Sequence, residues 1–121
     1  MEPRNPITKE QIQRALRERH SAGVQDKLDH ARVAVAGLGG LGSNVAFALA
    51  RIRVGHLHLI DFDRVDLTNL NRQQYFLRHL GMYKTDALKE ELLQINPYLD
   101  IRTDCIRVTE NNLPELFAED P

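Results

Sequence analysis

Three glycines with the spacing Gly-x-Gly-x-x-Gly, Gly37, Gly39 and Gly42, stand between an apolar run and a helical pattern. Glycine permits a tight turn and lets the main chain approach a phosphate without a Cβ in the way, and the neighbouring Gly40 extends this freedom. The N-terminus of the following helix offers N–H groups and a positive dipole to an anion. In this position between strand and helix, the spacing indicates a nucleotide-phosphate site.

A carboxylate follows at a spacing that suits a nucleoside. Asp61 lies about 20 residues after the last glycine, where such an acid accepts hydrogen bonds from a ribose. Another interpretation stays open for Asp61 and more so for Asp63, namely a carboxylate that caps a helix or orders a loop. Neither the glycine turn nor the acid distinguishes NAD from ATP.

The elements that must hold these residues follow a strand, helix, strand pattern. Residues 32–36 and 56–61 predict two strands, and a helix over 41–52 connects them as a right-handed crossover between parallel strands. The periodic residues of this helix predict the face that packs on the sheet: Leu41, Val45, Ala48, Leu49 and Ile52. The pattern therefore predicts an α/β fold, a Rossmann-like, mostly parallel sheet with flanking helices.

The rest of the chain continues this pattern after a long loop over residues 62–81, a kind of loop that often carries function. We expect a helix capped by Thr85 and ended by Asn96-Pro97, a strand over 100–108, and a helix over 110–117 capped by Thr109. A parallel series would normally supply another strand next. We therefore expect the chain to be the N-terminal, nucleotide-binding half of a larger domain.

The first thirty residues differ in character from this domain. Thr8 and Gln11 have the spacing of a capping box, which predicts a helix over 8–20, and a short helical turn is expected near 24–28. The first helix carries few apolar residues, so we interpret it as an arm or as a helix that packs on a partner. The predicted division is a helical arm over 1–30 and a Rossmann-like ATP-binding domain over 31–121.

The amino-acid composition excludes further classes of protein. The 121 residues carry a net charge of −1 and are 42% hydrophobic, which argues against a strongly basic nucleic-acid module and against a disordered chain. The one cysteine, Cys105, excludes an internal disulfide and is expected to be a buried thiol in the third strand. No apolar run is long enough for a signal core or a membrane span, so we expect a cytoplasmic protein.

Two further groups of side chains have alternative interpretations. His56 and His58 lie on one strand face and could bind a metal, but no third ligand at a suitable spacing is evident, so we assign no metal ligand to the chain. The aromatic residues of the long loop could stack on bases, although an anchoring role is favoured: Tyr75, Phe76 and Tyr83.

Four sequence segments together are specific. They are GLGGLGS at 37–43, DFDRVDLTNLNRQ at 61–73, GMYK at 81–84 and INP at 95–97. Over about residues 32 to 97 the chain resembles the ThiF/MoeB family of sulfur-carrier-protein adenylyltransferases, which are related to the ubiquitin-activating enzymes. The resemblance is greatest to thiamine-biosynthesis ThiF.

The resemblance implies ATP, bound with Mg²⁺, and attack of a carrier protein's C-terminal glycine carboxylate on the α-phosphate. By the family match, Gly40 lies under the nucleotide and Asp61 takes the ribose. Asn69 and Arg72 contact the phosphates, and Lys84 reaches them from the opposite side. Arg72 and Lys84 are then the catalytic residues, because a transition state that spreads negative charge over phosphate oxygens needs concentrated positive charge.

Other family features are missing from this sequence or are not assignable in it. The magnesium aspartate of the family, its catalytic or persulfide cysteine and its zinc-binding cysteines would follow Pro121, and Cys105 matches none of them. Family dimers also send an arginine from an N-terminal helix into the neighbour's site. Arg14, Arg17 and Arg19 are the candidates, with a solvated helix face as the alternative.

The resemblance implies a ubiquitin-like sulfur-carrier protein as partner, a homodimer, and no membrane. The first alternative is an enzyme that activates a carboxyl group on a modified tRNA nucleoside, which the net charge of −1 does not favour. The second is a non-catalytic module that binds a nucleotide or a ubiquitin-like protein. A nicotinamide dehydrogenase would leave Asn69, Arg72 and Lys84 without a role.

Overall fold

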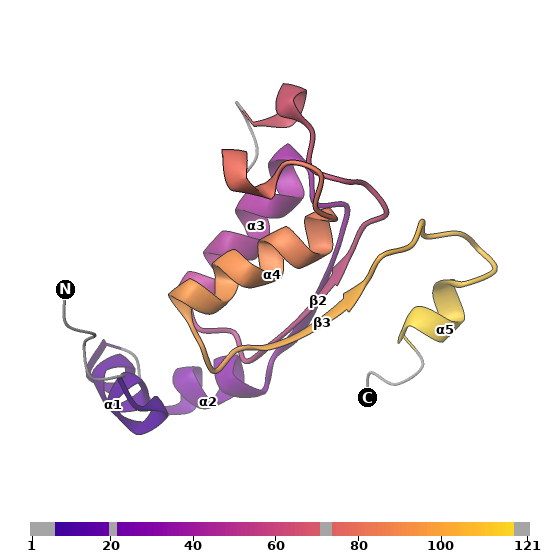
Figure 1. Cartoon of the computed structure of the whole chain (residues 1–121). Coiled ribbons are helices and arrows are strands. Elements are labelled where there is room, and N and C mark those ends of the chain that lie inside the picture. The colour runs from indigo at the N-terminus through magenta and orange to yellow at the C-terminus, as the bar shows by residue number, and fades with distance from the viewer. Residues whose placement is uncertain (1–6, 20–21, 71–73, 118–121) are drawn as a thin grey trace.

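A computed structural model describes residues 7–19, 22–70 and 74–117 of the chain. Its centre is a parallel three-stranded sheet in the order β1-β2-β3 (Figure 1). The strands are β1 (Arg32–Ala36), β2 (His56–Ile60) and β3 (Asp100–Asp104). In the register, His56 stands between Arg32 and Asp100. This confirms the predicted α/β, Rossmann-like fold.

Helices α3 (Gly40–Arg51) and α4 (Lys84–Ile95) lie side by side over one face of the sheet (Figure 1). Alternate strand residues such as Val35, Leu57 and Leu59 point to this face and are buried. They pack with Leu88 and Leu92 of α4 in one core cluster. Burying each such side chain contributes roughly 1.5–3 kcal/mol, so this layer stabilises the edge on which the glycine turn stands.

The predicted packing face of α3 is wrong in most of its positions. Leu41 is 82% exposed and Val45 and Ile52 are also exposed, and of the predicted set only Leu49 packs against the core. The buried residues of the helix are Ser43, Ala46 and Ala50. Small side chains let the helix approach the sheet closely. The face with the small residues therefore packs on the sheet, and the face with the largest apolar residues does not.

Helix α4 begins one residue earlier than the predicted cap. Tyr83 is its N-cap residue and Lys84 its first helical residue, so Thr85 is not the cap but a buried residue of the first turn. The Lys84 N–H donates to the main-chain oxygen of Asp63 at 2.9 Å, so a loop carbonyl takes the place of a side-chain cap. The helix ends at Asn96, as predicted.

The third strand is shorter than predicted. Asp104 pairs with Ile60, the last residue of β2, so in the described part of the chain residues 105–108 meet no neighbouring strand and β3 stops. Cys105 therefore lies after the strand and is exposed, which corrects the expectation of a buried thiol. The last helix, α5 (Leu113–Phe117), also starts later than predicted. Thr109 nevertheless makes a capping contact, since its hydroxyl accepts the Asn112 N–H and its own N–H donates to the Asn112 side chain.

The N-terminal helices are α1 (Lys9–Arg19) and α2 (Ala22–His30). The predicted capping box of α1 is confirmed: Thr8 N–H donates to the Gln11 side chain at 2.9 Å, and Gln11 N–H donates to the Thr8 hydroxyl at 3.1 Å. Helix α2 joins the domain through the Gly55 N–H, which donates to the Leu28 oxygen. The division at residue 30 stays a prediction.

The long loop contains two short 3-10 helices, η1 (Leu67–Asn69) and η2 (Leu77–His79). Within residues 7–19, 22–70 and 74–117, no helix has the length and apolar character that a membrane crossing requires.

Candidate functional site

The glycine turn joins the carboxyl end of β1 to the N-terminus of α3. Gly37 has a φ of +90°, a conformation that favours glycine, and its N–H donates to the Ile60 oxygen of β2 at 2.8 Å. A Cβ on Gly42 would lie 1.7 Å from the Gly37 oxygen, whereas one on Gly39 would meet nothing within 4 Å. Gly37 and Gly42 thus permit the turn and its close packing, and the space beside Gly39 is open.

Asp61 is placed directly after β2 and is 8% exposed. One carboxylate oxygen accepts the Leu38 N–H at 2.6 Å, and the other accepts the Asp63 N–H at 2.8 Å. The carboxylate therefore orders both the glycine turn and the start of the long loop, which is the loop-ordering role left open above. Two of its acceptor positions are used in this way, and its remaining lone pairs stay available to a ribose.

Lys84 reaches the same edge of the sheet because the two ends of the long loop pair with each other. Val65 N–H donates to the Met82 oxygen at 2.8 Å, and Arg64 and Tyr83 form an antiparallel bridge. The Lys84 side chain is 6% exposed, and its Nζ lies 3.9 Å from an Asp63 carboxylate oxygen. A buried ammonium thus stands beside the segment that carries Asp61.

Sequence reasoning missed three polar residues at or next to the glycine turn, Ser43, Asn44 and Gln74, and expected Tyr75 only as a loop anchor. Ser43 and Asn44 of α3 donate their side-chain hydrogens to the oxygens of Gly39 and Gly40. Tyr75 and Gln74 reach the same region from the long loop. The sequence signal that could have indicated them is the presence of polar residues directly after the last glycine and directly after the NRQ segment.

Some predicted site residues lie outside what the structure describes. Arg72 belongs to the segment 71–73, which is outside the described residues, and for Asn69, in η1, the side chain is not described. The same holds for the side chains of Arg17 and Arg19, whereas Arg14 is exposed. The roles of these residues stay predictions.

The aromatic residues of the long loop divide into two kinds. Tyr75 is buried and its hydroxyl donates to the Leu38 oxygen at 2.7 Å, so it anchors the loop as predicted. Phe76 is 51% exposed and Tyr83 is 36% exposed, so the anchoring role is wrong for them. Burial, with a smaller effect of Asp61, raises the pKa of Tyr75, so its hydroxyl stays a donor at neutral pH.

The two strand histidines each contact an aspartate of β3. His56 Nδ1 lies 2.8 Å from an Asp100 carboxylate oxygen, and His58 Nε2 lies 2.6 Å from one of Asp104. The paired register of β2 and β3 brings these partners together. These contacts give both histidines a role within the sheet.

A third histidine stands in a cluster of potential metal ligands, His79, Glu90 and Glu91. The Phe76 N–H donates to His79 Nδ1 at 2.8 Å, so in the neutral ring Nε2 carries the hydrogen. This nitrogen lies 3.2 Å from a Glu91 oxygen without a hydrogen bond to it, and the same oxygen accepts a hydrogen bond from Arg78. Because Nε2 has no free lone pair in this tautomer, the cluster does not suit a metal. Its contacts instead join η2 to α4.

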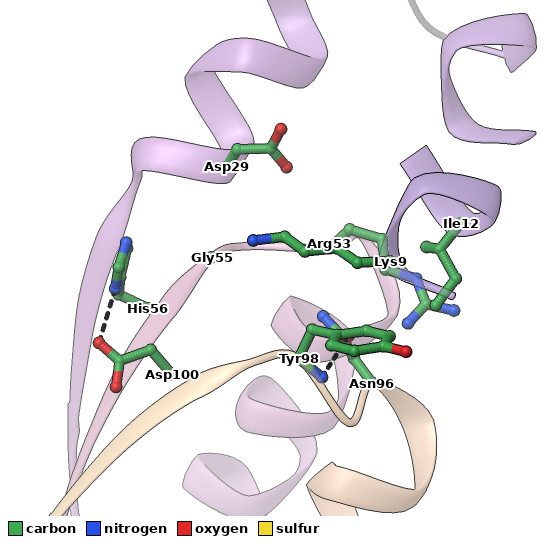
Figure 2. A pocket seen from close by; sticks show the side chains of 9 residues that line it. All are labelled: Lys9, Ile12, Asp29, Arg53, Gly55, His56, Asn96, Tyr98 and Asp100. Atoms are coloured by element: carbon green, nitrogen blue, oxygen red, sulfur yellow. Dashed lines mark hydrogen bonds and ion pairs between the residues drawn. The ribbon is translucent and has the colours of Figure 1, made fainter. Parts of the chain in front are cut away.

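The pocket in Figure 2, of about 200 Å³, lies at the opposite edge of the sheet. It is lined by Lys9 of α1, by Asp29 of α2 and by His56 and Asp100, the first residues of β2 and β3. Ligands of open parallel sheets bind outside the carboxyl ends of the strands. The pocket at the amino ends is therefore separate from the glycine turn.

Comparison with known proteins matches residues 9–120 to the model of the ThiF family. The chain belongs to the ThiF family. This confirms the resemblance drawn from the four sequence segments, and the match extends beyond residues 32–97 to include the N-terminal helices. The ThiF-family chain is thus related over nearly all of its length.

Two curated relatives carry the names of different enzymes. One is the molybdopterin-synthase adenylyltransferase of Haemophilus influenzae, 41% identical over 94 residues, which cover 77% of this chain and 39% of the relative. The other is the tRNA threonylcarbamoyladenosine dehydratase of Bacillus subtilis, 40% identical over 93 residues, 76% of this chain and 37% of the relative. This ThiF-family chain thus spans well under half the length of either relative.

Among solved structures, the Escherichia coli tRNA N6-threonylcarbamoyladenosine dehydratase in complex with ATP matches with a TM-score of 0.84 and 32% identity. The match covers 95% of this chain and 49% of that one. The fold of this ThiF-family chain is therefore similar to that of a protein that has been crystallised in complex with ATP.

Proposed function

We propose that the chain forms the ATP-binding part of an adenylyltransferase that activates the C-terminal glycine carboxylate of a ubiquitin-like sulfur-carrier protein. The observation that carries the proposal is the carboxyl edge of the sheet, where Asp61 holds the glycine turn and Lys84 lies beside Asp63. One edge thus combines a phosphate-binding turn, an acid at the ribose position and a buried cation. The pathway we propose is the biosynthesis of thiamine or of a related sulfur-containing cofactor, in the cytoplasm.

The surroundings of Lys84 favour ATP over NAD. The distance of 3.9 Å between its ammonium and the Asp63 carboxylate exceeds that of a hydrogen bond. Because removal from water penalises a buried charge, such an ammonium gains from a further anionic partner. The terminal phosphates of ATP supply one, and NAD has no terminal phosphate.

In the proposed reaction, a carboxylate oxygen of the carrier attacks the α-phosphorus of ATP and forms a new C–O–P linkage. The bond from this phosphorus to the bridging oxygen breaks, and pyrophosphate leaves with that electron pair. No general base is needed, because a carboxylate is already ionised at neutral pH. The N–H groups at the start of α3 together with Arg72 and Lys84 stabilise the negative charge that develops on the phosphate oxygens.

Magnesium accompanies ATP in this proposal, but the described residues at the edge do not suit a site for it. Both oxygens of Asp61 accept main-chain N–H groups, and Asp63 lies beside the Lys84 ammonium. Magnesium requires near-octahedral oxygen ligands, and these contacts do not provide them. We assign no magnesium ligand to these residues, and no step depends on one.

A second copy of the chain belongs to the proposal. Helix α1 lies at the amino edge of the sheet, where the Tyr98 hydroxyl donates to the Ile7 oxygen just before it at 2.6 Å. Its exposed Arg14 is therefore far along the sheet from the glycine turn of its own chain. We propose a homodimer in which an arginine of this helix serves the site of the neighbouring protomer.

Carboxyl activation on a modified tRNA nucleoside is the second candidate function. The solved tRNA dehydratase with ATP, at a TM-score of 0.84, favours it. The net charge of −1 counts against a tRNA-binding surface on this chain. A non-catalytic binding module is less well supported, since Asp61, Arg72 and Lys84 are retained together, which speaks against loss of the reaction.

Pyrophosphate exchange into ATP tests these functions on the full-length protein. The assay is run with sulfur-carrier proteins, with the same carriers lacking their C-terminal glycine as matched controls, and with tRNA. Exchange that depends on the terminal glycine supports the first proposal. Exchange with tRNA alone would replace it by the second, and ATP binding without any exchange would support the non-catalytic module.

A further inference from the structure

Three consecutive carbonyl oxygens of the glycine turn each accept a hydrogen bond from a side chain. The Tyr75 hydroxyl donates to the Leu38 oxygen at 2.7 Å. The Ser43 hydroxyl donates to the Gly39 oxygen, and the Asn44 amide donates to the Gly40 oxygen, both at 2.5 Å. The donors come from two segments, the first turn of α3 and the long loop after β2.

Gln74 completes this network from the long loop. Its side-chain NH₂ donates to the Asn44 amide oxygen, and its main-chain N–H lies 3.3 Å from the Ser43 hydroxyl oxygen. The first bond fixes the orientation of the Asn44 amide, because the oxygen must face Gln74 and the NH₂ group must face Gly40. Gln74 therefore acts on the Gly40 carbonyl through Asn44.

Fixing a carbonyl also fixes the N–H group of the next residue. The peptide unit is planar and trans, so its C=O and N–H point in opposite directions and rotate together. A hydrogen bond on the Leu38 oxygen thus sets the direction of the Gly39 N–H. In the same way, the bonds on the Gly39 and Gly40 oxygens set the directions of the Gly40 and Leu41 N–H groups.

Such control matters most in a glycine-rich turn. Glycine populates positive and negative φ about equally, so the unit that joins Leu38 to Gly39, which precedes α3, would otherwise rotate at little cost. The next two units are also restrained by α3 itself, since the Ser43 N–H donates to the Gly39 oxygen at 3.0 Å and Gly40 is the first residue of the helix. A rotated unit would present its partially negative oxygen to a phosphate in place of its N–H. The side-chain hydrogen bonds remove this alternative before the nucleotide arrives.

We propose that Tyr75, Asn44 and Gln74 are positioning residues that hold the N–H groups of Gly39 and Leu41 toward the phosphates of the bound nucleotide. This inference rests on the proposed function, since it requires ATP at the glycine turn. These residues act through the main chain and do not themselves contact the phosphates. Their effect is therefore specific to the phosphate part of the ligand.

The test compares the affinities for ATP and for adenosine, measured by titration calorimetry on the same protein. Tyr75→Phe and Gln74→Ala are each expected to weaken ATP binding about 3- to 10-fold, the effect of one typical hydrogen bond, and to change adenosine binding less than about 2-fold. The matched controls are Tyr98→Phe, which removes a hydroxyl bonded to a carbonyl at the other edge of the sheet, and Gln94→Ala on the exposed side of α4. Both controls should bind ATP as the wild type does.

Amide nitrogen and proton chemical shifts give a second readout. On addition of ATP, the Gly39 and Leu41 signals should shift in the wild type and in both controls. The Gly39 signal should shift less in Tyr75→Phe, and the Leu41 signal should shift less in Gln74→Ala. A merely structural role would instead lower the melting temperature and weaken both ligands together. If Tyr75→Phe fails to fold, the partly exposed Gln74→Ala carries the test.

The outcomes distinguish a failure of the proposed function from a failure of this inference. A wild-type protein that binds ATP no more tightly than adenosine would overturn the proposed function, and this inference with it. A wild type that prefers ATP, together with variants that bind ATP normally, would overturn the inference alone. Equal losses of ATP and adenosine affinity in the variants would also overturn it.

Discussion

The Asp61 carboxylate accepts the main-chain N–H of Leu38 at 2.6 Å, and this bond connects the end of β2 to the glycine turn after β1. The two residues are far apart in the sequence, but parallel pairing of β1 and β2 places their carboxyl ends at one edge. Asp61 is therefore part of the turn's architecture as well as the predicted ribose acceptor. Substitutions at Asp61 must be interpreted with both roles in view.

Asp61→Ala is expected to weaken ATP binding by roughly 1–3 kcal/mol, the range for hydrogen bonds to a charged group. It should also lower the free energy of unfolding, because the Leu38 and Asp63 N–H groups lose their acceptor. Calorimetry with ATP and with NAD, together with urea unfolding, measures both effects. Wild-type preference for NAD, or unchanged ATP affinity in the variant, would contradict the assignment.

Gly42→Ala is expected to destabilise the fold by roughly 3 kcal/mol, because overpacking a site that cannot relax is costly. The added Cβ would lie 1.7 Å from the Gly37 oxygen, a main-chain atom of the turn itself. Gly39→Ala is the matched control, since its Cβ would meet nothing within 4 Å. Thermal unfolding of both variants makes the comparison, and equal melting temperatures would show that the turn can shift to accept the methyl group.

Arg72→Ala is expected to lower turnover by about 10² to 10³ with a smaller effect on ATP affinity, since the contact strengthens as the α-phosphate gains charge. Arg72→Lys should restore little, because lysine cannot hold two oxygens in one plane. Single-turnover adenylate formation by the full-length protein, at saturating ATP and carrier, gives the rate. A near-normal rate with weaker ATP binding would make Arg72 a ground-state phosphate ligand and leave Lys84 as the main stabilising charge.

His79 is expected to make the fold less stable in mild acid. Burial, with a smaller contribution from Arg78, lowers the pKa of His79 below its ordinary value of 6.5, and the Phe76 N–H on Nδ1 favours the neutral ring. The folded protein therefore binds this proton less readily than the unfolded chain. The contribution of the neutral ring to stability is full above about pH 6.5 and is lost as the pH falls below that value.

Urea unfolding at pH 7.5 and pH 5.5 measures this dependence. The decrease in the free energy of unfolding between the two pH values should be smaller in His79→Gln than in the wild type. His30→Gln, which changes an exposed histidine, should keep the wild-type decrease. If the free energy of unfolding of His79→Gln decreases as much as that of the wild type, groups other than His79 cause the acid sensitivity.

Local sequence determined the central elements well. The apolar run at residues 32–36 matches β1 to the residue, because a short β-branched stretch before a glycine turn has few other conformations available. The capping box of Thr8 and Gln11 and the end of α4 at Asn96 were also predictable, since their bonding partners lie within one helical turn. The four sequence segments were enough to give the family.

Features that depend on distant partners needed the tertiary structure. The buried face of α3 follows from how closely Ser43, Ala46 and Ala50 approach the sheet, and hydrophobic periodicity cannot measure that distance. Likewise, β3 ends at Asp104 because β2 offers no further partner, although residues 105–108 look extended in sequence. Strand length and helix rotation are properties of a pair of elements, so neither segment specifies them alone.

At the candidate site, the sequence by itself determined which chemical groups are present: a glycine turn, a carboxylate, and cations in the loop and at the next helix. The tertiary structure decided that Asp61 bonds to Leu38, that Lys84 lies buried beside Asp63, and that the Tyr75 hydroxyl of the long loop bonds to the Leu38 carbonyl. Whether two groups form a hydrogen bond depends on their distance and relative orientation. For segments far apart in the sequence, residue spacing does not give this orientation.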